Sequence, residues 1–304
     1  MAFRFGIDLG GTKTEIAVLD DDGVVTARFR TPTPSSDYHS IISTVVHLVD
    51  EAAGRVGPPR SIGVGHPGAI SPVTGLIKNS NTTVLNGRPL ALDLAAALRQ
   101  PVALANDADC LALSEAQDGA GSGYDIVFGV ILGTGVGGGI VVRRTLVRGP
   151  NAITGEWGHN PLPAQDEHER PGPACYCGRN GCIETFLSGR GLARTYRDLA
   201  NEEVPATTVA QRAAAGEMKA VQTVEMYCRR LAKALAAVIN LLDPHVIVLG
   251  GGVSNIESVY ELVPELWGDH VLSDTVETKL VAAAHGDSSG VRGAAWLTEV
   301  TAQP

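Results

Sequence analysis

Two segments of the sequence, 123 residues apart, share one design: an apolar strand pattern, a glycine turn, and a second apolar strand that returns. The first begins at residues 5–10 (FGIDLG) and the second at residues 128–133 (FGVILG). Self-similarity at this spacing predicts a chain duplicated into two similar halves. Two halves that face each other would leave a cleft with one glycine turn on each side, and clefts between domains are where small ligands usually bind.

The spacing of apolar residues indicates which segments form strands and helices. It predicts strands over 3–9, 14–19, 24–30, 62–65, 101–105 and 246–249, and helices over 37–54, 217–242 and 288–299. Parallel strands covered by helices are the natural packing of such segments, so we expect an α/β fold. A chain of 304 residues is expected to divide into two domains, here 1–117 and 118–287.

Charge and hydropathy narrow the class of protein. The net charge is −9, from 24 Lys and Arg against 33 Asp and Glu, which argues against nucleic acid as a partner. The longest uncharged stretch, 126–142, falls short of the roughly 20 apolar residues that a membrane helix needs. With no secretion signal visible, we expect a cytoplasmic protein without a membrane partner.

The first glycine turn, Gly10-Gly11-Thr12-Lys13, follows a strand that contains a carboxylate, Asp8. Glycines let backbone N–H groups approach phosphate oxygens, and a nearby threonine or lysine adds a donor or a charge. The alternative is a tight hairpin turn whose glycines serve geometry alone. Burial of Asp8 is costly without a cation, and we expect Mg²⁺ bound to nucleotide phosphates, held partly through water. The second turn, residues 133–139, offers only donors.

Asn106 and Asp107 follow the strand over 101–105 and open a helix. They can form an ordinary helix N-cap. They also stand at the carboxyl end of a predicted parallel strand, where α/β sheets place ligands. Asp107 is therefore a candidate general base that accepts a hydroxyl proton during phosphoryl transfer, with Asn106 orienting the same substrate.

Three cysteines and one histidine form a candidate metal site. Cys175, Cys177 and Cys182, with His159 upstream, supply the Cys₃His ligand set of a closed, structural zinc site. Reduced structural thiols or a redox pair are the alternatives. Two acidic residues flank this set, Glu156 and Glu184, and such fixed carboxylates can accept hydrogen bonds from a polyol. The other two cysteines, Cys110 and Cys228, lie in helical patterns and are predicted core residues.

Taken together and in this order, residues 8–13, Asn106-Asp107, Glu156-x-Gly158-His159 and the run from Cys175 to Glu184 resemble the ROK family of sugar kinases. Within it, residues 76–94, 155–163 and 286–296 are most similar to bacterial manno(fructo)kinases. The resemblance implies an actin-like ATPase (ribonuclease H-like) fold, with two α/β domains around a cleft and a zinc-bound loop over 155–185. It also implies that the C-terminal helix, about 288–304, packs back on the first domain.

The resemblance further implies ATP-dependent phosphorylation of the 6-hydroxyl of fructose, with mannose as a second substrate, Asp107 as the base and Mg²⁺ near Asp8. A homodimer is expected from the family. The implied nucleotide contacts are Gly6, Asp8, Gly10, Gly11, Thr12, Lys13, Gly133, Thr134, Gly135, Gly137, Gly138, Gly139, Gly250, Gly251 and Gly252. The implied sugar contacts are Asn81, Asn106, Asp107, Glu156, His159 and Glu184. His159 would bind zinc through one ring nitrogen and a sugar hydroxyl through the other.

Three alternatives stay open at this stage. A glucokinase or an N-acetylhexosamine kinase would carry the same catalytic residues. A sugar-responsive repressor of the family needs a DNA-binding segment ahead of the first turn, and here that turn begins close to Met1. His66, which replaces an apolar or small residue common in the family, either faces the sugar or is a loop histidine with a local partner.

Overall fold

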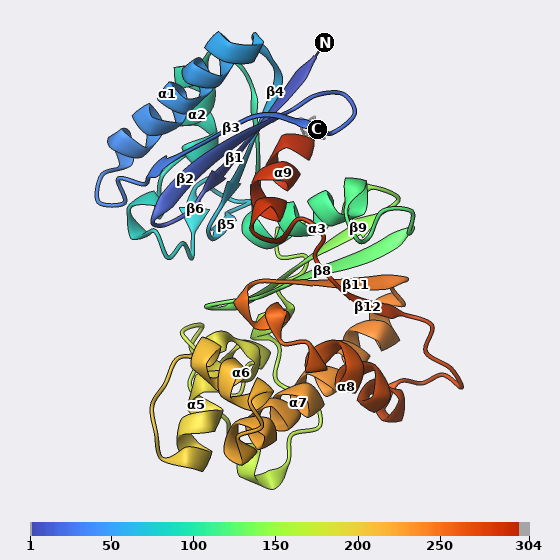
Figure 1. Ribbon diagram of the computed structural model, residues 1–304. Coiled ribbons are helices and arrows are strands. Elements are labelled where there is room, and N and C mark those ends of the chain that lie inside the picture. The colour runs from blue at the N-terminus through green and yellow to red at the C-terminus, as the bar shows by residue number, and fades with distance from the viewer. Residues whose placement is uncertain (1, 298–304) are drawn as a thin grey trace.

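A computed structural model describes residues 2–297 of the chain. Each half contains one five-stranded sheet (Figure 1). The first sheet comprises β1 (Phe3–Leu9), β2 (Lys13–Leu19), β3 (Val25–Pro32), β4 (Pro59–His66) and β7 (Val102–Asn106). The second comprises β8 (Ile126–Leu132), β9 (Val136–Val142), β10 (Thr145–Leu146), β11 (Val246–Gly250) and β12 (Lys279–Ala282). A separate hairpin joins β5 (Ala69–Ile70) to β6 (Ile77–Lys78).

The two sheets have the same topology. The strand orders are β3-β2-β1-β4-β7 and β10-β9-β8-β11-β12. In each sheet the first three strands form an antiparallel meander. The other two strands run parallel to the first strand of the meander, which is β1 in one sheet and β8 in the other. The predicted duplication and the α/β class are therefore confirmed. Since parallel strands end together at one edge, the turns after β1 and β8 occupy equivalent places.

Helices lie at each place where the sequence predicts one. One more, α2, lies in the first half, and several more lie in the second half. The helices are α1 (Tyr38–Val56), α2 (Leu90–Leu98), α3 (Asp107–Asp118), α4 (Ile183–Leu187), α5 (Gly189–Ala200), α6 (Ala206–Ala214), α7 (Met218–Leu242), α8 (Ser258–Leu266) and α9 (Ser289–Trp296). The Asp37 carboxylate caps α1 by accepting the Ser40 N–H at 2.7 Å. Asp243, in the left-handed conformation, ends α7 just before Pro244. The predicted continuation of the last helix to residue 304 falls on 298–304, outside the described residues.

Two helices, α3 and α9, form a shared layer between the sheets (Figure 1). Glycines allow the close contacts on both sides. A Cβ on Gly129 of β8 would lie 2.5 Å from the Ala112 methyl of α3, and one on Gly63 of β4 would overlap the Ala294 carbonyl oxygen of α9. The predicted boundary at 117 falls at the end of α3, a helix that packs on the second sheet although it precedes that sheet in the sequence.

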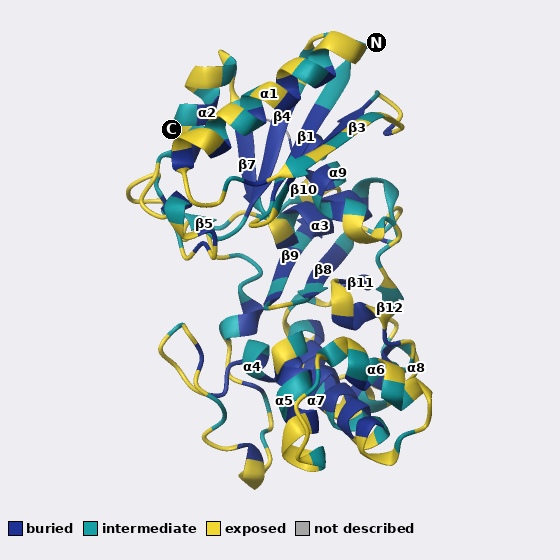
Figure 2. Cartoon of the chain, turned by 60° about the vertical axis from the view of Figure 1, so that its left-hand side comes forward, coloured by how far each residue is buried: buried dark blue, intermediate teal, exposed yellow. Residues whose placement is uncertain are grey.

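Buried side chains concentrate on the inner strands and on the helix faces that cover them (Figure 2). One core lies between β1, β4 and helices α1 and α2, and a larger one surrounds α7 beneath the second sheet. Cys110 and Cys228 are fully buried, as predicted. Within residues 2–297, the helices are too short or too polar to cross a membrane.

Candidate functional site

The first glycine turn joins β1 to β2 with its tip in solvent. The Gly10 N–H donates to the Lys13 carbonyl at 3.0 Å, and Thr33 holds the turn from below by donating its hydroxyl to the Gly10 carbonyl at 2.8 Å. Gly11 and Thr12 are exposed at the tip. This geometry leaves the tip backbone open to a ligand, as a phosphate-binding turn requires.

Asp8 lies half-buried in β1, just before this turn. Among the described residues, none donates a hydrogen bond to its carboxylate. Burial, then the nearby Asp107 and Glu15 carboxylates, raise the pKa of Asp8 to about 6, whereas Lys13 lowers it. An acidic oxygen without a donor beside the first glycine turn fits a divalent cation, because the cation would supply the missing positive charge.

The second turn is narrower than the sequence suggests. Gly133, Thr134 and Gly135 make the turn, and the Gly133 N–H donates to the Gly135 carbonyl at 3.0 Å. Gly251 and Gly252 follow β11 next to this turn, since a Cβ on Gly251 would lie 2.6 Å from the Leu132 carbonyl oxygen. These residues can form one continuous backbone surface for a nucleotide.

Five of the predicted nucleotide contacts are also close packing positions. Gly137, Gly138 and Gly139 lie inside β9 and pack under α3, the Phe128 ring and the Trp157 ring. A Cβ on Gly6 would overlap the Val291 carbonyl oxygen of α9, and one on Gly250 would overlap the Leu111 side chain. Packing alone therefore requires glycine at these five positions, and their contact with a nucleotide stays a prediction.

The start of α3 places Asn106 and Asp107 at the end of β7. The Asn106 side-chain oxygen accepts the Asp109 N–H at 2.6 Å and caps the helix, while the Asp107 carboxylate accepts the Ala108 N–H at 2.9 Å. Asp107 is exposed as a residue, but partial removal of its carboxyl group from water raises the pKa of that group above the ordinary value. A carboxylate of raised basicity that solvent and substrate can reach is what a general base requires.

Glu156 and Glu184 bring the second half of the chain to the same place. Burial raises the pKa of the Glu156 carboxyl, as do Asp107 and Glu184, while His159 and Lys78 lower it. Glu184, at the start of α4, accepts the Val136 N–H at 3.0 Å. The carboxylates of Asp107 in α3, Glu156 in the loop after β10 and Glu184 in α4 therefore interact electrostatically. Residues far apart in the sequence thus form one polar site.

The four candidate zinc ligands come together. The ligand atoms of His159, Cys175, Cys177 and Cys182 all lie within 4.8 Å of one another. The Cys175 Sγ is 3.5 Å from His159 Nδ1, and the Cys177 and Cys182 sulfurs are 3.6 Å apart. Zinc–sulfur bonds of about 2.3 Å in a tetrahedron put the sulfurs about 3.8 Å apart, so the cluster has the size and the donors that zinc needs.

The other nitrogen of His159 does not face open solvent. His159 Nε2 hydrogen-bonds the Tyr176 hydroxyl at 2.9 Å. This contact takes the position that the sequence assigns to a sugar hydroxyl, so a sugar would have to replace Tyr176 there. Asn81 is exposed, on a loop whose neighbour Thr82 lies against Gly11, and its sugar contact stays a prediction.

His66 ends β4 beside Asn106 but is buried, with its Nδ1 3.1 Å from the Pro67 carbonyl oxygen. Burial lowers the pKa of its imidazole. His66 therefore has a local partner, and its role toward the sugar stays open.

Sequence reasoning missed three charged or polar residues at the site: Lys78, Asp109 and Tyr176. Lys78 lies in β6, and its charge acts on Glu156. Asp109 follows Asp107 by two residues, and burial raises the pKa of its carboxyl to about 7. The signal available for Asp109 and Tyr176 was their position within the Asn106-Asp107 and Cys175-x-Cys177 motifs.

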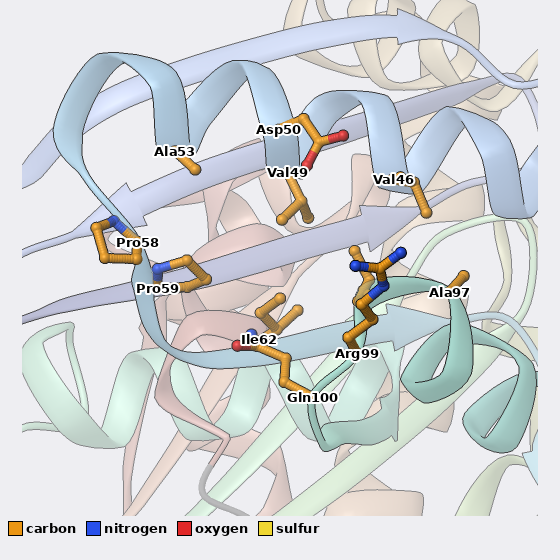
Figure 3. Close-up of a pocket in the computed structure, with 11 residues that line it drawn as sticks. Val46, Val49, Asp50, Ala53, Pro58, Pro59, Ile62, Ala97, Arg99 and Gln100 are labelled. Atoms are coloured by element: carbon orange, nitrogen blue, oxygen red, sulfur yellow. The ribbon is translucent and has the colours of Figure 1, made fainter.

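A surface hollow of about 480 Å³ lies elsewhere, between α1, the start of β4 and the end of α2 (Figure 3). Pro59 and Ile62 line it at the amino half of β4, and Gln100 precedes β7. Ligands of α/β sheets bind at the opposite, carboxyl ends of the strands. The hollow is therefore not part of the site around Asp107.

Comparison with known proteins agrees with this architecture. The sequence model of the ROK family matches residues 4–300. An N-acetyl-D-glucosamine kinase from Pectobacterium atrosepticum is 39% identical over 297 residues, 96% of this chain and 98% of that protein. The ROK hexokinase structure from Thermus thermophilus superposes with a TM-score of 0.86 at 31% identity over 96% of both chains. A ROK glucokinase from Streptomyces griseus, solved with glucose and AMPPNP, gives 0.80 at 26% identity over 98% of this chain and 99% of its own.

The chain belongs to the ROK family, and its fold is the actin-like ATPase fold of that family. Its finer assignment to the manno(fructo)kinases is not supported. Relatives at 39% and 40% identity are N-acetyl-D-glucosamine kinases, which match one of the alternatives. The segments that suggested a fructokinase, residues 76–94, 155–163 and 286–296, lie around β6 and α2, in the loop that carries Glu156 and His159, and at α9.

Proposed function

We propose that this ROK protein is a sugar kinase that transfers the γ-phosphoryl group of ATP to the 6-hydroxyl of N-acetyl-D-glucosamine. The observation that carries the proposal is the meeting of Asp107, Glu156 and Glu184 beside two glycine turns. The N-acetyl-D-glucosamine kinases at 39–40% identity, which the chain matches over 96% of its length, support the choice of sugar. Fructose, the first expectation, has no such support.

In the proposed reaction, the Asp107 carboxylate accepts the proton of the 6-hydroxyl. The sugar oxygen then forms a bond to the γ-phosphorus as the bond from that phosphorus to the ADP oxygen breaks. Asn106 fixes the first turn of α3 and hence the position of Asp107. The raised pKa of Asp107 helps this step, because a more basic carboxylate holds the proton better.

The proposed sugar contacts are Glu156, Glu184, Asn106, Asn81 and His159, and carboxylates and amides of this kind accept and donate hydrogen bonds to a polyol. Phosphates would lie on the tip of the first turn, on residues 133–135 and near Gly251 and Gly252. The homodimer stays a prediction.

Two metals fit the residues present. Asp8 would hold Mg²⁺, which neutralises phosphate charge when bound. His159, Cys175, Cys177 and Cys182 would hold zinc, and because all four positions are protein ligands, that zinc would shape the loop that carries Glu156 and Glu184 rather than activate water.

A kcat/KM panel with MgATP tests the proposal. We expect the highest value for N-acetylglucosamine, followed by glucose, mannose and fructose. A protein that releases no ADP in response to any of these sugars contradicts the kinase assignment. A protein that prefers fructose supports the kinase and contradicts the choice of sugar.

A further inference from the structure

Tyr176 is held in place but open to solvent. It stands between two candidate zinc ligands, Cys175 and Cys177. Its hydroxyl bonds His159 Nε2 at 2.9 Å, and the two rings meet edge to face, with centroids 5.0 Å apart and planes at 87°. Even so, 74% of the residue is exposed. The ring is held by its hydroxyl group and by the backbone on either side, yet most of it is uncovered. Such a ring offers apolar surface to a ligand.

The Tyr176 hydroxyl lies at the proposed sugar side of the site. Its partner, His159 Nε2, is the position that the sequence assigns to a sugar hydroxyl. Tyr176 therefore borders the polar contacts and can add apolar surface beside them.

The sugars that must be told apart differ in one substituent. N-Acetylglucosamine carries an acetamido group where glucose carries a hydroxyl, so a methyl group must be covered when the first sugar binds. Covering a methyl group is worth about 10- to 200-fold in kcat/KM. A pocket lined only by polar groups would not favour N-acetylglucosamine over glucose in this way.

We propose that Tyr176 is a specificity-determining residue, whose ring packs on the acetamido methyl group of an N-acetylhexosamine. In the unliganded protein its hydroxyl occupies His159 Nε2. When a sugar hydroxyl takes that nitrogen, the Tyr176 hydroxyl leaves it and the ring lies beside the sugar. The inference rests on the proposed function and deepens it, because it names the residue that selects the substrate.

The test compares Tyr176→Ala, Tyr176→Phe and the wild type on N-acetylglucosamine, glucosamine and glucose. Tyr176→Ala should lower the kcat/KM ratio of N-acetylglucosamine to glucose at least tenfold, mainly through KM for the acetylated sugar. Tyr176→Phe keeps the ring and should keep the ratio. Tyr124→Ala, at the far end of β8 with its hydroxyl on Lys279, is the matched control and should leave the ratio unchanged.

Zinc content, measured by elemental analysis, should equal that of the wild type in all three variants, which separates loss of the ring from loss of the loop. If the wild type prefers N-acetylglucosamine and Tyr176→Ala keeps that preference, the inference is overturned while the proposed function stands. If the wild type has no such preference, both fall. Equal losses on all sugars in Tyr176→Ala would also overturn it, since they indicate a structural role.

Discussion

The Glu184 carboxylate accepts the backbone N–H of Val136 at 3.0 Å, which ties the loop of the candidate zinc ligands to the turn at residues 133–135. A Cβ on Gly135 would lie 2.6 Å from the same Glu184 oxygen, so the turn and the carboxylate are fitted to each other. One side chain therefore contacts the proposed phosphate side of the site and also faces the proposed sugar side. Such a link couples the two substrates, because displacing Glu184 disturbs both.

Because only Glu184 has this link, substitutions of Glu184 and Glu156 should have different effects on the two substrates. Glu184→Ala should raise KM for both ATP and sugar, about tenfold or more each, because the turn loses its anchor. Glu156→Ala should raise KM for the sugar alone, since no backbone group of the turn among the described residues bonds to it. Steady-state kinetics with each substrate varied in turn measure both effects. Equal KM values for ATP in Glu184→Ala and the wild type would contradict the coupling.

Removal of the proposed base should separate chemistry from binding. Asp107→Asn should lower kcat by about 10²- to 10⁴-fold, while the sugar dissociation constant in calorimetry changes little. Asp109→Asn, two residues along the same helix, is the comparison, because Asp109 is half-buried and has no proposed role in the proton transfer, so its replacement should cost far less activity. Asp107 is not the base if Asp107→Asn keeps activity within about tenfold.

The ionised Asp8 carboxylate should lower the free energy of unfolding while it serves the proposed Mg²⁺ site. Its pKa is raised from 3.8 to about 6 in the folded protein, so the folded state binds a proton more tightly than the unfolded state and loses stability as pH rises from about 4 to about 6. In metal-free protein at pH 7, Asp8→Asn should remove this penalty, about 1–2 kcal/mol after screening, and raise Tm by about 2–4 °C.

Two further outcomes check this interpretation of Asp8. The gain in Tm should become small near pH 4, where the wild-type carboxyl is protonated in the folded state and close to half protonated in the unfolded state, and activity with MgATP should fall sharply in the same variant. Calorimetric scans at pH 4 and pH 7 measure the first outcome. A gain in Tm that is the same at both pH values would exclude the carboxylate charge as its cause.

Zinc should be present and structural. Elemental analysis is expected to find one zinc per chain, and Cys177→Ser should lose it together with most sugar-kinase activity, because the loop with Glu156 and Glu184 is no longer fixed. Cys228→Ser, a buried cysteine of α7 outside the cluster, is the matched control and should keep zinc. Fully active protein without zinc would refute the assignment.

Two helical glycines should respond in opposite directions to the same substitution. Gly54, in α1, has open space around its missing Cβ, so Gly54→Ala should stabilise the protein by about 0.4–1 kcal/mol. Gly293, in α9, meets the Cys110 carbonyl oxygen of α3, so Gly293→Ala should destabilise it by about 1–3 kcal/mol. Urea unfolding at equal protein concentration measures both. A stabilised Gly293→Ala would show that α9 does not seat tightly on α3.

Local patterns in the sequence were sufficient for much of this protein. Apolar alternation and helical spacing located β1, β2, β3, β7, β11, α1 and α7 to within about two residues at each end, and found the second half of β4, because a few consecutive side chains decide which face is buried. Cysteine spacing also identified the four residues of the candidate zinc cluster, three of which lie within eight positions of the chain. The substrate did not follow from these motifs, since related sugar kinases share them.

Tertiary structure alone decided what each glycine and each site residue contacts. Gly6 and Gly11 look alike in the first motif, yet Gly6 makes room for α9 from the other end of the chain, whereas Gly11 stays at an exposed tip. Likewise, the sequence predicted a sugar hydroxyl as the partner of the second His159 nitrogen, whereas in the folded protein His159 Nε2 bonds the Tyr176 hydroxyl. The physical reason is the same in both cases: a short pattern fixes local conformation, whereas contacts between distant segments depend on how the two sheets and the α3–α9 layer pack.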